Sequence, residues 1–300
     1  MQTVAEGLNV PEGPVALDDG SVLVVEVMGK TLTRVRSGGS THVVAQLGGG
    51  PNGAAVGPDG AVYVCNNGGL EMEWAGGVLT HYGRANDYAG GSIQRVDLAT
   101  GRVDVLYTHC DGAPFSGPND LVFDASGGVW FTDSGHRLAE YKEWGALYYA
   151  RPDGSKVERV RSHLALPNGV GLSPDGATVY VADSLAGSVW GCDLTGPGQL
   201  KIAEVPAFTG RLVGRQTELA GRDSLALEAS GRICVASAPG RICVITPDGG
   251  TENVAVPDVM PTNLCFGGAD MRDVWITGGA GGRLIKTRWP TPGAPLAFRA

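Results

Sequence analysis

The sequence lacks long hydrophobic runs and sustained helical periodicity. No stretch of about 18 apolar residues is present, so no membrane-spanning helix is predicted. Alternating runs of Val, Ile, Leu and Tyr are instead bounded by Gly, Asp and Pro, which is typical of β-structure. The chain is therefore predicted to be all-β.

Positive charge is also scarce. The 300 residues include 23 Lys and Arg against 31 Asp and Glu, a net charge of −8. No basic face is expected to offset phosphate repulsion, so we predict no nucleic-acid partner. Residues 1–6 lack the positive region and apolar stretch of a secretory signal. We expect a cytoplasmic protein with a small-molecule substrate and no membrane partner; the oligomeric state is left open.

Cysteine and histidine are few. No pair among the 6 Cys has the spacing of a metal finger, and most lie in or beside apolar strands, so reduced, buried thiols are expected. There are 5 His, and no Gly-x-Ser-x-Gly elbow accompanies them. Nucleophilic serine chemistry is therefore disfavoured.

Glycine, with 48 residues, is abundant and marks a repeat. Six short apolar strands each follow a tight turn, and a further strand follows each of them after another glycine. The strands are 22–27, 62–66, 129–133, 179–183, 233–237 and 274–278. A unit repeated at about 40 to 65 residues is typical of a β-propeller blade. We predict a single six-bladed β-propeller over residues 1–300, with a central channel.

A second periodicity places one acidic or amide residue per repeat, six to eight residues before the turn: Glu12, Asn52, Asn119, Asn168, Asp223 and Asn263. We expect these residues at the start of the innermost strand of each blade, around one mouth of the channel.

Oxygen-bearing side chains around one axis favour a hard divalent cation. A single Asn or Asp after Pro is explained as well by turn capping. Six at one position, two of them carboxylates, favour a metal site. Ca²⁺ is our first choice for this cation because it tolerates mixed oxygen coordination, with Mn²⁺, Mg²⁺ and Zn²⁺ as alternatives.

Three parts of the sequence resemble the SMP-30/gluconolactonase/LRE-like family, which includes regucalcin and bacterial sugar lactonases. They are EGP at residues 12–14, SGPND at 116–120 with VWFTD at 129–133, and LPNGV at 166–170 with YVADS at 180–184. The resemblance spans nearly the whole chain and implies a six-bladed propeller with a divalent cation at the channel mouth.

By this resemblance, Glu12, Asn168 and Asp223 are the metal ligands, and Asp223 is also the candidate general base. Asn119 would contact the substrate or a metal-bound water, and we assign Asn52 to substrate binding with it. The chain differs from the family at two positions: Ser224 replaces a usual glycine, and Gly117 replaces a sugar-contacting arginine of regucalcin-like members.

Two further residues are assigned to substrate binding. Trp74 lies in the long connection 66–91, which we predict to be a lid-like insertion over the mouth. His136 follows an apolar strand; a plain loop histidine, a substrate contact and a general acid or base all remain open for it. Trp144 and Tyr141, in another long connection, are additional candidates for the pocket wall.

The predicted function is that of a metal-dependent hydrolase that opens a sugar-lactone-like ring, with the cation as Lewis acid and Asp223 as candidate base. Alternatives are hydrolysis of another ester-like electrophile such as a phosphotriester, a non-hydrolytic reaction like that of strictosidine-synthase-like relatives, and a non-catalytic scaffold. A scaffold would expose an aromatic or charged face and would lack convergent carboxylates.

Overall fold

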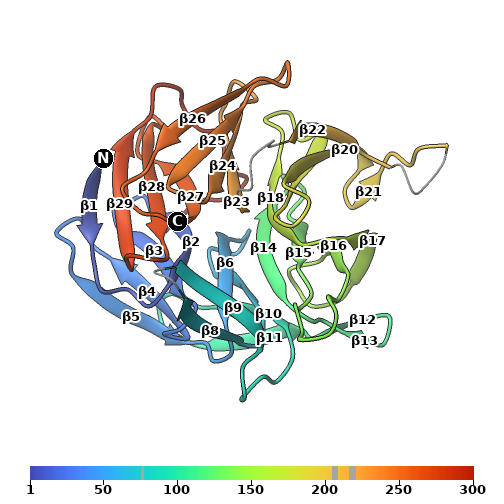
Figure 1. Cartoon of the computed structure of the whole chain (residues 1–300), viewed down its shortest axis with the longest axis horizontal. Helices are drawn as coiled ribbons and strands as arrows, with labels where there is room; N and C mark the ends of the chain where they lie inside the picture. Colours follow the sequence, from blue (N-terminus) through green and yellow to red (C-terminus); the bar gives the residue numbers. More distant parts are fainter. Residues whose placement is uncertain (76–77, 205–208, 216–220) are drawn as a thin grey trace.

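Six antiparallel sheets surround one axis (Figure 1). The computed structural model describes residues 1–75, 78–204, 209–215 and 221–300, with the side chains of 74, 75, 78–82 and 215 left out. Within these residues all regular elements are strands. No helix that is long and apolar enough to cross a membrane occurs among the described residues. The six-bladed β-propeller is confirmed.

Each blade contributes four strands, counted here from the channel outward. The innermost strands are β2 (Pro11–Ala16), β6 (Pro51–Val56), β14 (Pro118–Phe123), β18 (Pro167–Leu172), β23 (Arg222–Leu227) and β27 (Pro261–Gly267). The second strands are β3 (Val22–Glu26), β7 (Val62–Asn66), β15 (Val129–Asp133), β19 (Thr178–Asp183), β24 (Ile233–Ser237) and β28 (Asp273–Gly278). The third strands are β4 (Thr31–Val35), β10 (Ser92–Val96), β16 (Gly145–Ala150), β20 (Ser188–Gly196), β25 (Arg241–Ile245) and β29 (Arg283–Arg288).

The outer strands are β5 (Thr41–Gln46), β11 (Val103–Tyr107), β17 (Val157–Leu164), β22 (Arg211–Arg215), β26 (Thr251–Ala255) and β1 (Gln2–Ala5). Because β1 pairs with β29, strands from the two ends of the sequence share one sheet. The short hairpins β8 (Leu70–Ala75) with β9 (Val78–Arg84) and β12 (His109–Cys110) with β13 (Ala113–Pro114) lie outside the blades. The short strand β21 (Gln199–Leu200) pairs antiparallel with the end of β20.

The core consists of six apolar clusters, one between each pair of neighbouring blades. The predicted apolar runs are the second strands, and four of these six are buried at every residue. Both faces of such a strand are covered, so the sequence shows continuous apolar runs. All six cysteines are free, and five are buried.

Each innermost strand contains one extra residue near its start. The extra residue follows the first pair with the second strand in five blades, and in β2 it follows the second pair, Glu12 with Val25. In β18, for example, Pro167 pairs with Asp183 and Val170 with Val181, so three steps on one strand match two on the other. The same shift occurs in all six blades. Such bulges re-aim side chains, and here they fall at the predicted site residues.

A glycine allows the bulges of two neighbouring blades to contact each other closely. A Cβ on Gly169 in β18 would lie 2.5 Å from the backbone N of Leu225 and 2.7 Å from Cα of Ser224. Backbone atoms at this distance cannot move aside independently, so only glycine allows β18 and β23 to approach this closely.

Gly169→Ala is therefore expected to lower the free energy of unfolding by about 1–3 kcal/mol, the usual effect of overpacking. Gly221→Ala is the matched control, because its Cβ would meet nothing within 4 Å. Urea denaturation followed by circular dichroism measures both. Equal stability of the two variants would contradict the close packing of these bulges.

Candidate functional site

A cavity of about 140 Å³ lies where the innermost strands begin. Among the residues that line it are six of the seven predicted for the site: Glu12, Asn52, Asn119, His136, Asn168 and Asp223. The seventh, Trp74, has its side chain outside the described residues. Five blades thus bring residues far apart in sequence to one cavity. Asn52, Asn119, Asn168 and Asp223 lie in the bulges of their strands, and Glu12 directly precedes the bulge of β2.

The sixth blade differs from the prediction. Thr262, not Asn263, lies in the bulge of β27 and lines the cavity. Asn263 follows it, pairs with Thr277, and donates from Nδ2 to Oε2 of Glu12 over 2.9 Å. The prediction for Asn263 is therefore wrong by one residue: its amide supports Glu12 and does not face the cavity.

Three carboxyl groups are buried together. Glu12 and Asp120 are 4% and 6% exposed, and Asp223 is half-buried. Burial, then the nearby charge of Asp223, raises the pKa of Glu12 well above its usual range. Burial raises the pKa of both Asp120 and Asp223 to about 7, and the charge of Asp120 adds to the effect on Asp223. The charged forms of these acids are therefore disfavoured unless a positive charge accompanies them.

Asp120 was missed by the sequence analysis as a member of this group. It directly follows Asn119 in the bulge of β14, and it lines a second, larger cavity of about 450 Å³ rather than the one that holds Asn119. The sequence feature that points to Asp120 is the pair of successive polar residues, Asn119 and Asp120, in an otherwise apolar strand.

Ser224, which departs from the family pattern, joins these groups. Its Oγ donates to Oδ1 of Asn168 over 3.3 Å, and a hydrogen bond from Ser224 also lowers the pKa of Asp120 against the effect of burial. The hydroxyl therefore couples a predicted ligand to the buried acid behind it.

The donor set fits a hard cation. The Oδ1 atoms of Asn52 and Asn119 are buried without a hydrogen-bond partner, and they line the same cavity as Glu12, Asn168 and Asp223. Carboxylate and amide oxygens suit Ca²⁺, Mg²⁺ or Mn²⁺. Nowhere in the described part of the chain do three or more His, Cys, Asp or Glu side chains form a group that could hold a metal. A cation here would therefore depend on amide oxygens beside two carboxylates.

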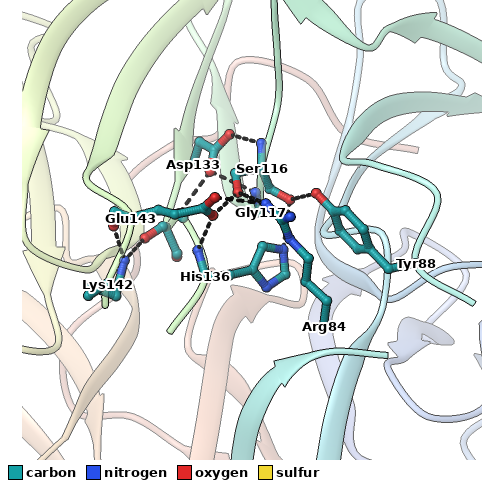
Figure 2. A network of polar contacts seen from close by, with 10 residues as sticks. Arg84, Tyr88, Ser116, Gly117, Asp133, His136, Lys142 and Glu143 are labelled. Carbon is teal, nitrogen blue, oxygen red and sulfur yellow. Dashed lines mark hydrogen bonds and ion pairs between the residues drawn. The ribbon is translucent and has the colours of Figure 1, made fainter. Parts of the chain in front are cut away.

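His136 is held by a polar network at the cavity edge (Figure 2). Its backbone N–H donates to Oε2 of Glu143 over 3.0 Å, and Glu143 also accepts from Ser116 Oγ and pairs with Arg84. The ring of His136 meets Tyr88 edge to face, with centroids 5.0 Å apart.

The tautomer of His136 follows from its partners. Nε2 lies 2.8 Å from the backbone O of Ser116, which can only accept, so Nε2 carries the proton. Burial lowers the pKa of His136 and favours the neutral ring. Nδ1 is then an acceptor, and it is buried without a partner. His136 is thus a fixed, neutral acceptor in the wall of the cavity rather than a solvated loop residue.

Two wall candidates are not part of the cavity. Trp144 and Tyr141 are exposed and do not line it. The segment 66–91 contributes through β8, whose Leu70 and Met72 line the cavity. Its lid-like role stays a prediction. Asp133, at a strand end, accepts from the backbone N–H groups of Ser116, Gly117 and Gly135, so it organises loops.

A sequence model described as the SMP-30/Gluconolactonase/LRE-like region matches residues 10–280. The chain belongs to this family.

Among its relatives, a gluconolactonase of Zymomonas mobilis is 30% identical over 230 residues, which cover 73% of this chain and 58% of the relative. A diisopropyl-fluorophosphatase of Loligo vulgaris is 25% identical over 197 residues, 61% of this chain and 60% of the relative. The chain therefore matches about three fifths of the length of these relatives.

The fold recurs in solved structures. The calcium-binding protein regucalcin of Agrobacterium tumefaciens superposes with a TM-score of 0.77 at 19% identity, over 99% of this chain and 97% of that one. At this identity the likeness establishes the fold alone.

The buried acids predict a pH-dependent stability in metal-free protein. Their pKa values rise on folding, so their stabilising contribution is complete below about pH 4 and is lost as the pH rises through about 7. In EDTA, urea denaturation should show wild-type stability falling more between pH 5 and 8 than that of Asp223→Asn. Added Ca²⁺ should recover the difference at pH 8. Identical pH profiles for the two proteins would contradict charge repulsion at this site.

Proposed function

We propose that the chain is a metal-dependent hydrolase that opens a lactone ring, with Glu12, Asn168 and Asp223 as protein ligands of one divalent cation. The observation that carries the proposal is the meeting of these three side chains in one cavity with two unpartnered amide oxygens. Ca²⁺ is the preferred cation because all donors are oxygens, and Mn²⁺, Mg²⁺ and Zn²⁺ are alternatives. Family membership and the gluconolactonase relative support the reaction class.

When bound, a divalent cation would supply Lewis-acid polarisation of the lactone carbonyl and stabilise the negative charge that develops on its oxygen. The neighbouring residues fix the ligands. Glu12 is oriented by the Gly13 N–H over 2.8 Å and by Asn263 over 2.9 Å, and Asn168 is held by Ser224. These contacts hold the side chains of Glu12 and Asn168, so the orientation of their remaining oxygens is set by the backbone of the innermost strands.

Asp223 is the candidate base that takes a proton from the attacking water. Coordination lowers the basicity of a carboxylate, so the two roles compete for its oxygens. A hydrogen bond from Asn168 also lowers the pKa of Asp223 against the effect of burial.

Two variants separate ligand from base. Asp223→Asn keeps an oxygen donor but removes the base, so kcat should fall about 10²- to 10⁴-fold while Ca²⁺ affinity by calorimetry falls much less. Asp223→Ala should lose both. Asp248→Asn, in an exposed turn, is the control and should change neither. Full turnover by Asp223→Ala would exclude the proposed role.

The Loligo relative, a diisopropyl-fluorophosphatase, favours hydrolysis of a phosphotriester-like electrophile as the second candidate. Protein stripped of metal and then restored should be assayed on lactones, aryl esters and phosphotriesters. We expect lactones to be hydrolysed fastest and only after metal is restored. Faster turnover of phosphotriesters would favour the second candidate, and no activity on any class would refute the hydrolase.

His136 is proposed as a substrate contact through Nδ1. His136→Gln can keep a donor to the Ser116 carbonyl while losing the Nδ1 acceptor, so KM should rise about tenfold with little change in stability. His136→Asn keeps an acceptor near Nδ1 but loses the Ser116 contact, so its melting temperature should fall instead. Steady-state kinetics and thermal melts of both variants check this. An unchanged KM in His136→Gln would remove His136 from the substrate site.

A further inference from the structure

Residues two positions before the polar ring line part of the cavity, namely Val10, Gly117, Leu166 and Met260. Each of the six residues at this position directly precedes the innermost strand of its blade. These six rim positions, in blade order, are Val10, Gly50, Gly117, Leu166, Gly221 and Met260. Every one is apolar or glycine.

Two of the apolar rim residues, Val10 and Met260, adjoin on one side of the cavity. A Cβ on Gly279 would meet Met260 Cε and would lie 3.6 Å from Val10 Cγ1, so these two side chains adjoin over Gly279. Val27 donates its backbone N–H to the Val10 carbonyl over 3.0 Å and also lines the cavity. Val10 and Met260 are half-buried and therefore still able to contact a ligand.

Neutral polar groups occupy the side left open by glycine. A Cβ on Gly50 would clash with the Asn67 side chain, and one on Gly117 would lie 3.5 Å from His136 Nε2. Asn67 and His136 both line the cavity. This side offers hydrogen bonds from uncharged groups, whereas the side of Val10, Val27 and Met260 offers none from its side chains.

No lysine or arginine is among the described residues that line the cavity. Arg84, in the network beside His136, pairs with Glu143 over 2.8 Å and stacks on Tyr88. Lys142 donates to the backbone carbonyls of Ser134 and Glu143. An anionic substrate would therefore meet Glu12 and Asp223 without a compensating side-chain cation, and a polyhydroxylated one would bury hydroxyls against Val10 and Met260.

We propose that the substrate is an uncharged lactone that carries a short apolar substituent, seated against Val10, Val27 and Met260, with its ring over the polar residues. This inference rests on the proposed lactonase function and names its substrate class. A cavity of about 140 Å³ is well below the size used for drug-sized ligands, which favours a single small ring.

The first test measures the hydrolysis of γ-lactones that share one ring by Ca²⁺-restored protein. The substrates are the unsubstituted lactone, its γ-ethyl and γ-butyl derivatives, a sugar γ-lactone and a lactone with a γ-carboxylate group. We expect kcat/KM to rise about fourfold per methylene that becomes buried, and the γ-ethyl lactone to exceed the sugar lactone by about tenfold or more. A sugar or carboxylate lactone hydrolysed faster than the γ-ethyl lactone would overturn the substrate class and leave the hydrolase standing. Absence of turnover on lactones, esters and phosphotriesters alike would refute the function itself.

The second test uses binding alone. Calorimetry of the Ca²⁺-loaded protein should show 2-butylcyclopentanone, which cannot be hydrolysed, binding at least about tenfold more tightly than cyclopentanone. Met260→Gln, similar in size but polar, should reduce that ratio to about twofold or less. Val259→Thr, at a neighbouring residue that is 54% exposed and outside the cavity, should leave it unchanged. An unchanged ratio in Met260→Gln would overturn the proposal.

Discussion

The extra residue in each innermost strand is the constraint on which this site depends. In a regular strand, side chains alternate between two faces, and in every blade both faces pack against neighbouring blades. The inner edge of each sheet faces the central axis of the propeller. A regular strand at this edge presents only its backbone to the axis. A bulge turns a side chain out of this alternation. Bulges that contain or directly follow the site residues therefore accompany a ring of polar side chains inside an apolar core.

The same constraint brings like charges together. Glu12 and Asp223 lie in different blades, and Asp120 in a third stands close enough to raise the pKa of both. Burial removes the water that would screen them. The fold tolerates this arrangement because each blade is fixed by its own apolar interfaces, so the acids cannot separate. The unpartnered Asn52 and Asn119 oxygens show that the polar ring is not satisfied from within the protein.

The sequence predicted the blades well and the site in part. Second strands such as β7 and β24 are buried on both faces, so their apolar runs marked them with nearly correct ends. Equivalent positions in successive repeats identified Glu12, Asn168 and Asp223. Asn263 was misplaced by one residue. In the other innermost strands that begin with proline the site residue directly follows the proline, a position that Thr262 occupies in β27. The tautomer of His136, and with it the unpartnered Nδ1, depends on the Ser116 carbonyl, 20 residues away in sequence.

In the proposed function, chemistry belongs to residues at the start of the innermost strands, and substrate selection belongs to the residues that directly precede them. Bulge residues carry the oxygens, and their positions depend on backbone contacts such as the Gly13 N–H to Glu12 bond. Rim residues such as Val10, Leu166 and Met260 precede the first paired residue of their strands, so their side chains can change without altering the bulge. A rim of different polarity could then be combined with the same polar ring.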